Sequence, residues 1–74
     1  MMRADNVELL AVLGSHLNAA LAAVRGNVDR MRGLDPNSIE ATFVRLAHAS
    51  ACERVRRLAL AIERVQLRLS REAA

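Results

Sequence analysis

Three side chains of this 74-residue sequence have the donor atoms of a transition-metal site: His16, His48 and Cys52. His48 and Cys52 are four residues apart, so on a helix they share one face. If the chain folds back on itself, His16 falls roughly level with Cys52, and a His/His/Cys zinc site is conceivable. The pattern offers no fourth ligand, however, and buried histidine and cysteine are common in apolar cores. We therefore predict no metal and no cofactor.

His16 also allows a second chemistry, the transfer of a phosphoryl group. The segment 15–26 is similar to the histidine box of sensor-kinase dimerisation domains, which are dimeric four-helix bundles. It departs from that pattern because the acidic residue directly after the histidine and the proline that usually follows are both missing. Phosphotransfer on a dimeric helical bundle therefore stays as an alternative function.

The basic residues are all arginines, and the charge is uneven along the chain. Residues 1–37 carry four arginines and four acidic residues, whereas residues 38–74 carry seven arginines and four glutamates, so the net charge of +3 lies in the second half. Basic helices can follow nucleic-acid phosphates. Here the arginines are interleaved with Glu53 and Glu63, and the only aromatic residue is Phe43, so no stacking platform exists. Nucleic-acid binding is an alternative that we consider weaker than protein binding.

Other features exclude whole classes of function. The sequence holds no glycine-rich phosphate loop, nucleophile motif or metalloprotease motif, so we expect no enzyme activity. One cysteine cannot form an internal disulfide, which favours a reducing, cytoplasmic setting. No segment reads as a signal peptide or as a membrane span of about 18 apolar residues, so we expect no membrane partner.

Periodicity predicts an all-α fold: a single domain over residues 1–74, built as an antiparallel two-helix hairpin that associates into a helical bundle. The first helix is predicted at about residues 5–32, with Asp5 and Glu8 at the spacing of a capping box. Steps of three and four residues define one face of this helix. That face comprises Val7, Leu10, Gly14, Leu17, Leu21, Val24, Val28 and Met31.

The turn is predicted at residues 33–35 and the second helix at about 36–72. Gly33 suits the left-handed residue after a helix end. Asp35 can cap the next helix, and Pro36 suits its first turn. So short a connection predicts antiparallel helices.

The second helix carries two apolar stripes. Its seam, interrupted only by His48, is Ala41, Val44, His48, Ala51, Val55, Leu58, Ile62, Val65 and Leu69. The stripe on the opposite side consists of Ile39, Leu46, Leu60 and Leu67, with Phe43 beside it and Glu53 breaking it. The predicted helix lengths leave an overhang of about two turns that contains Val65, Leu67 and Leu69. Unpartnered apolar side chains favour a homodimer or a heteromer with another protein.

The end of the first helix resembles the small two-helix co-chaperones of type III secretion needle subunits. The matching residues are Leu17, Ala20, Leu21, Val24, Val28, Met31, Arg32 and Gly33. This resemblance implies a cytosolic hairpin that binds a second chaperone and keeps a needle protein unpolymerised. Independently of it, we predict a protein-binding adaptor or chaperone that acts through apolar helix faces. The predicted partner-binding residues are Phe43, Leu46, Leu60, Arg64, Leu67 and Arg68.

Overall fold

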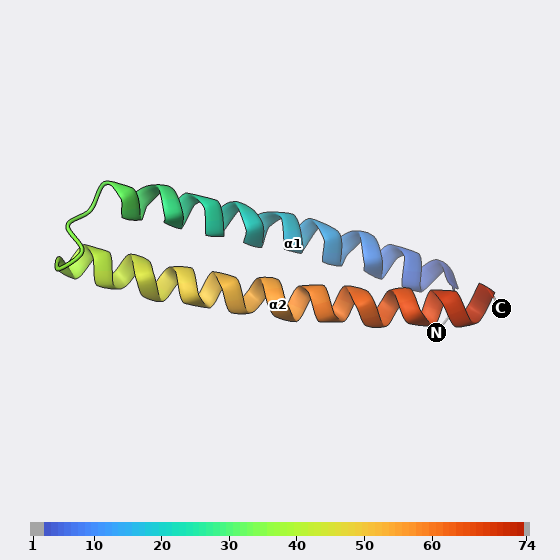
Figure 1. Cartoon of the computed structure of the whole chain (residues 1–74). Helices are drawn as coiled ribbons and strands as arrows, with labels where there is room; N and C mark the ends of the chain where they lie inside the picture. The colour runs from blue at the N-terminus through green and yellow to red at the C-terminus, as the bar shows by residue number, and fades with distance from the viewer. Residues whose placement is uncertain (1–2, 74) are drawn as a thin grey trace.

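Two long helices make up the protein in the computed structural model, which describes residues 3–73 (Figure 1). α1 spans Arg3–Arg32, and α2 spans Ile39–Ala73. The helices run antiparallel, and together they form a rod with extents of 54 × 14 × 14 Å. The predicted all-α hairpin is confirmed.

α2 buries the seam that its periodicity predicts. Ala41, Val44, Ala51 and Val65 are buried, and the other seam positions are half-buried. These residues recur at steps of three and four, which keeps them on one side of a helix and facing α1. The second helix was therefore predicted correctly in its inward face.

α1 packs through a face that is rotated slightly from the predicted one. Its best-buried residues are Asn6 and Ala20, whereas Val7 is 51% exposed. The prediction of Val7 as a seam residue is wrong, because the polar Asn6 next to it holds that position instead. Leu10 and Leu17 belong to both the predicted and the observed face of α1, and they are half-buried as expected.

The start of α1 also differs from the prediction. The helix begins at Arg3, so Asp5 lies inside its first turn rather than at the cap position. A negative charge in the first turn of a helix interacts favourably with the helix dipole. The spacing of Asp5 and Glu8 therefore marked the right end of the helix without being its capping box.

The connection between the helices is longer than predicted, and Ser38 is the residue that caps α2. The Ser38 hydroxyl accepts a hydrogen bond from the amide of Ala41 at 3.1 Å, which is the N-cap arrangement. Asp35 instead shapes the turn: its carboxylate accepts from the amide of Asn37 at 3.0 Å, and its carbonyl accepts from the amide of Ser38 at 3.0 Å. α2 therefore starts at Ile39 and not at Pro36.

Gly33 ends α1 without the predicted left-handed conformation, since its φ is not positive. The amide of Gly33 donates to the carbonyl of Arg30, and that of Leu34 donates to the carbonyl of Met31, both at 3.3 Å. These bonds span three residues, so the helix ends by tightening its last turn.

A hydrogen bond between the two helices fixes their register at the open end of the hairpin. The side-chain amide of fully buried Asn6 donates to Glu72 Oε1 at 2.8 Å. α1 thus reaches nearly to the end of α2, Val65 is only 1% exposed, and Leu69 is half-buried. The predicted two-turn overhang is wrong. α1 has 30 residues and α2 has 35, a smaller difference than the sequence indicated.

The buried core is small. Its apolar members in the described range are three alanines and two valines: Ala20, Ala41, Val44, Ala51 and Val65. Small side chains let the helices approach closely, but each buries little apolar area, and hydrophobic stabilisation scales with that area. A single hairpin is therefore weakly stabilised by its own core.

Candidate functional site

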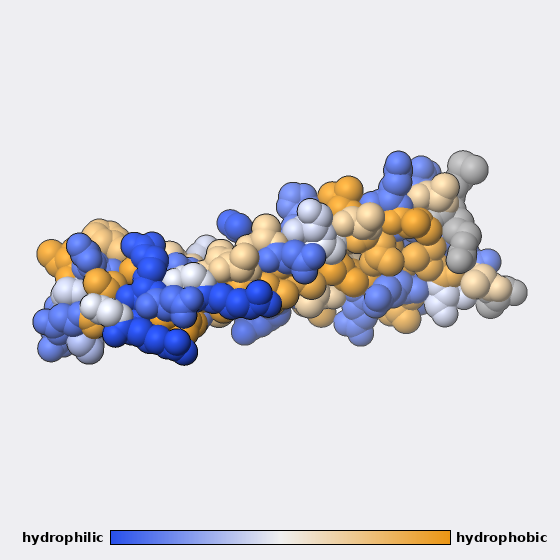
Figure 2. Space-filling view, turned by 90° about the horizontal axis from the view of Figure 1, so that it is seen from above, coloured by the Kyte–Doolittle hydropathy of each residue, from blue (hydrophilic) through white to orange (hydrophobic). Residues whose placement is uncertain are grey.

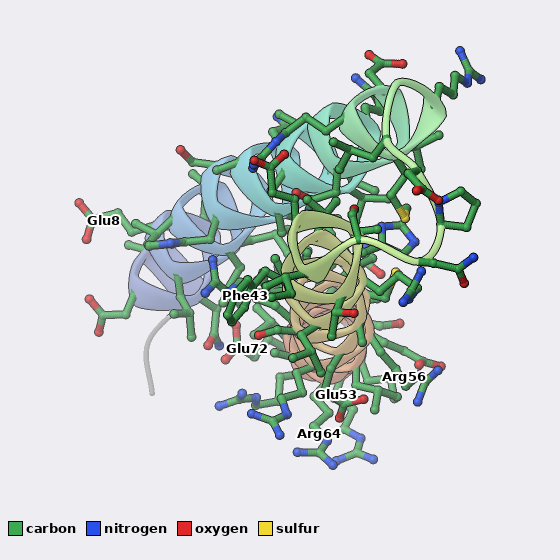
Figure 3. The ribbon with its side chains drawn as sticks, turned by 90° about the vertical axis from the view of Figure 1, so that its left-hand side faces the viewer. Glu8, Phe43, Glu53, Arg56, Arg64 and Glu72 are labelled. Atoms are coloured by element: carbon green, nitrogen blue, oxygen red, sulfur yellow. The ribbon has the colours of Figure 1, made fainter. Side chains whose placement is uncertain are left out.

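The surface of α2 that α1 leaves uncovered carries the most exposed large apolar side chains of that helix, with Phe43 on its flank (Figure 3). We call this set the outer stripe: Ile39, Phe43, Leu46, Leu60 and Leu67. Their exposed fractions run from 48% at Leu60 to 75% at Ile39. Four of them recur at multiples of seven residues, so a helix aligns them on one face. The exposure predicted for this stripe is confirmed.

Two predicted partner-binding arginines lie near the outer stripe. Arg64 points away from α1, on the same side of the rod as Glu53 and Arg56 (Figure 3). Arg68 is exposed and lies one residue after Leu67. Guanidinium groups beside an apolar stripe can orient a partner and increase the rate of association.

Glu53 interrupts the stripe at its centre, and its charge is compensated within the chain. Its two carboxylate oxygens accept from Arg56 and Arg57, each at 3.3 Å. These pairs connect residues three and four apart on an exposed helix face, so each contributes only about 0.5 kcal/mol to stability. Their larger effect is to hold two arginines beside the gap in the stripe.

The histidines and the cysteine do not form the zinc site that the sequence allowed. Cys52 Sγ lies 3.6 Å from His48 Nε2, as their spacing predicts. His16, however, is exposed on α1. The register set by Asn6 and Glu72 places His16 roughly level with residue 62, which is ten residues, or about 15 Å along the axis, from Cys52. Within residues 3–73, no group of three histidine, cysteine or acidic residues is arranged to hold a metal ion.

Comparisons with protein-family models, with curated proteins and with solved structures find no match. Functional inference for this chain therefore depends on its own surfaces.

α1 presents a second apolar surface, of a different kind. Seen from the α1 side, apolar side chains gather toward the end of the rod where the termini lie, and hydrophilic ones gather toward the turn (Figure 2). Val7 and Val12 are the exposed large apolar residues of this helix. They flank the start of an uncharged segment, residues 9–24, which contains both His16 and Asn18.

By length and composition alone, α1 passes as a candidate membrane span, which the sequence analysis did not anticipate. It contains an 18-residue stretch that is strongly apolar and of which little is buried in the hairpin. The uncharged segment 9–24 is about 24 Å long as a helix, shorter than the roughly 30 Å of a bilayer core. A helix that packs against protein has the same composition.

Sequence reasoning missed the exposed side of α1. Val12 was assigned to no face, and Val7 was placed in the seam. The position of Asn6 could have distinguished the buried face of α1 from its exposed side. A polar residue can occupy a seam position when the hairpin buries a hydrogen bond to its side chain. Ile39, the most exposed residue of the outer stripe, was recognised as part of the stripe but was not among the predicted contact residues.

Proposed function

We propose that this protein is a small protein-binding adaptor or chaperone that uses the outer stripe of α2 to pair with helices of other protein chains. The observation that supports this function most directly is that large apolar side chains on the uncovered surface of α2 remain exposed after the hairpin has formed. Amphipathic helices commonly bind by laying one apolar face on another.

The energetics of the hairpin favour the same function. Domains of this size bury only about 60% of their unfolded surface and usually need a further source of stability. The five small apolar residues of the core supply little area, and Cys52 has no second cysteine to bond. Binding to another chain supplies stability by mass action.

The shape of the molecule fits this role. The radius of gyration is 16.7 Å, compared with about 11 Å expected for a compact chain of this length. A long, thin rod exposes its helices along their whole length. A partner helix can therefore run along α2 over several turns.

A more specific proposal follows from the resemblance to needle-subunit co-chaperones. We propose that the protein acts in the cytoplasm of a cell with a type III secretion system, where its partner is a second chaperone or a needle subunit. The outer stripe would be the contact, with Phe43, Leu46, Leu60 and Leu67 as anchors. Arg64 and Arg68 would add little affinity while they remain exposed to solvent.

A binding experiment tests the general function. The tagged full-length chain is used to capture partners from the native host, and each candidate is then purified and titrated against the wild type and against Leu60→Glu/Leu67→Glu. We expect at least a roughly 30-fold loss of affinity for the double variant, because buried apolar anchors dominate such interfaces. The matched control is Val7→Glu/Val12→Glu, which adds the same charges on α1.

Salt and cell fractionation separate the competing explanations. Apolar association tolerates 0.5 M salt, whereas contacts to nucleic-acid phosphates weaken steeply. Equal binding by both double variants would contradict the proposal. Recovery of the chain in washed membranes, with no protein partner, would assign the apolar surface of α1 to a bilayer instead.

A further inference from the structure

The outer stripe is symmetric along α2. Glu53 is its central position, Leu46 and Leu60 lie seven residues to either side, and Ile39 and Leu67 lie fourteen residues to either side. Reversing the direction of the helix places apolar positions on apolar positions. A surface with this property is complementary to a reversed copy of itself, which is what an interface with two-fold symmetry requires.

The charges of α2 are not symmetric, and they select one orientation. After Glu53 the exposed side chains include Arg56, Arg57, Arg64 and Arg71. Residues 41–52 hold a single charged side chain, Arg45. Its guanidinium group donates to the carbonyl of Pro36 at 3.0 Å and to the hydroxyl of Thr42 at 3.3 Å, so it is already engaged within the chain.

Two copies of α2 can therefore pair favourably in only one direction. A parallel pair would set the arginine-rich half of each copy against the same half of the other, and like charges in contact are destabilising. An antiparallel pair sets each arginine-rich half against residues 41–52. Phe43 then lies within about one turn of Leu67 in the second copy, where neighbouring guanidinium groups can also stack on its ring.

The exposed area of the hairpin matches what such a pair needs. The chain exposes 5558 Å², whereas a compact protein of its mass exposes about 4,500 Å². The excess is roughly 1,000 Å², and a standard interface buries about 800 Å² on each partner. One face-to-face contact along α2 is thus enough to bring the exposed area close to that of an ordinary globular protein.

We propose that the outer stripe is covered by a second copy of this chain, with the two α2 helices antiparallel about a two-fold axis near Glu53. This inference rests on the proposed function, because the same face that binds partner helices binds the second copy when no partner is present. The two Glu53 carboxylates then meet at the axis, and Arg57 of each copy lies about one turn, or roughly 6 Å along the helix, from the level of Glu53 in the other. The four arginines and two glutamates at the centre form one shared network.

The oligomeric state of the full-length chain is the first test. Sedimentation equilibrium from low to high micromolar concentration is expected to show a dimer. Leu46→Glu/Leu60→Glu should weaken dimerisation by roughly 100-fold or more, while Val7→Glu/Val12→Glu should leave it unchanged. Circular dichroism of each variant confirms that the helices persist. A monomer at all concentrations, or a dimer equally sensitive to both double variants, would overturn the proposal.

Cysteine cross-linking tests the orientation in a Cys52→Ala background. Under mild oxidation Glu53→Cys should cross-link to itself, because its position lies at the two-fold axis. Leu67→Cys should not cross-link to itself but should cross-link to Ile39→Cys when the two variants are mixed. Self-cross-linking of Leu67→Cys would show a parallel pair and refute this arrangement. If the wild type is monomeric but Leu46→Glu/Leu60→Glu still loses a purified partner, the dimer is wrong and the binding function stands.

Discussion

Val65 and Leu67 are two residues apart on α2, yet their surroundings are opposite. Val65 is buried against α1, and Leu67 is exposed on the outer stripe. A helix that is apolar on one side needs one partner, whereas α2 is apolar on two sides and α1 covers only one of them. The inner seam of α2 therefore determines the fold, and its outer stripe remains available for association.

The largest expected effect on stability comes from a substitution that breaks the backbone of α1 where it packs against α2. Leu21→Pro in α1 removes a helical hydrogen bond and introduces a steric clash, at a cost of about 3 kcal/mol or more. With so small a core, we expect this variant to lose most of its helical signal in far-ultraviolet circular dichroism. Leu21→Ala is the control, and it should stay helical. A normal spectrum for the proline variant would show that α1 is not a continuous helix in solution.

The next largest effect is expected from aspartate substitutions that compare the buried and the exposed face of α2. Val65→Asp buries a carboxylate with no partner, which we expect to reduce the free energy of unfolding by about 3 kcal/mol or more. Leu67→Asp places the same group in solvent and should change the stability of the monomer by less than about 0.5 kcal/mol. Urea unfolding, at a protein concentration too low for association, measures the free energy of unfolding of both variants. Similar losses in the two variants would mean that the faces are not distinct.

How far the sequence predicted these faces depends on which residues occupy them. The seam of α2 is almost entirely apolar, so its period was sufficient to predict it. The seam of α1 includes Asn6 and Ala20, and neither residue type by itself predicts burial. The apolar Val7 was assigned to the seam in their place, so the predicted face was rotated from the observed one. Polarity alone does not show which of two adjacent residues faces a partner.

The errors at the turn have a different cause. Asp35 and Pro36 have the residue types of a helix start, but the same types also form a tight turn, and Ser38 three residues later competes for the cap position. Local sequence cannot choose between two candidate caps that lie three residues apart. The exposure of the outer stripe was predictable from its spacing, whereas its occupant was not, because a single sequence contains no information about a partner chain.

The third prediction concerns that cap. Ser38→Ala leaves the amide of Ala41 without its side-chain partner, and we expect a loss of about 1 kcal/mol in the free energy of unfolding. Ser50→Ala, on an exposed position of the same helix, is the matched control and should have no comparable effect. Thermal or urea unfolding of the two variants distinguishes a cap at Ser38 from one at Asp35.

A fourth and smaller effect is expected at the open end. Glu72→Ala leaves the side-chain amide of buried Asn6 unpaired, for a loss of up to about 1 kcal/mol that the terminal position reduces. Glu72→Gln preserves an acceptor and should recover most of the loss. If both variants unfold like the wild type, the hydrogen bond contributes nothing to the inner seam.

The smallest effect on the monomer is expected on the outer face. Glu53→Gln weakens two exposed ion pairs and should cost less than about 0.5 kcal/mol. If the same change affects dimerisation more than monomer stability, the network at the centre of the outer stripe operates between chains. Sedimentation and unfolding of this one variant therefore sharpen the distinction between the two faces of α2.

The hydrogen bond between Asn6 and Glu72 joins residues that are 66 positions apart, whereas the bonds around Ser38 join near neighbours. The entropy of closing a loop rises with its length, so contacts beside the turn form at a lower entropic cost than contacts at the open end. Folding should therefore proceed as a zipper that starts at the turn and finishes at the termini. Changes near Ser38 should slow folding, and changes at Asn6 or Glu72 should mainly accelerate unfolding.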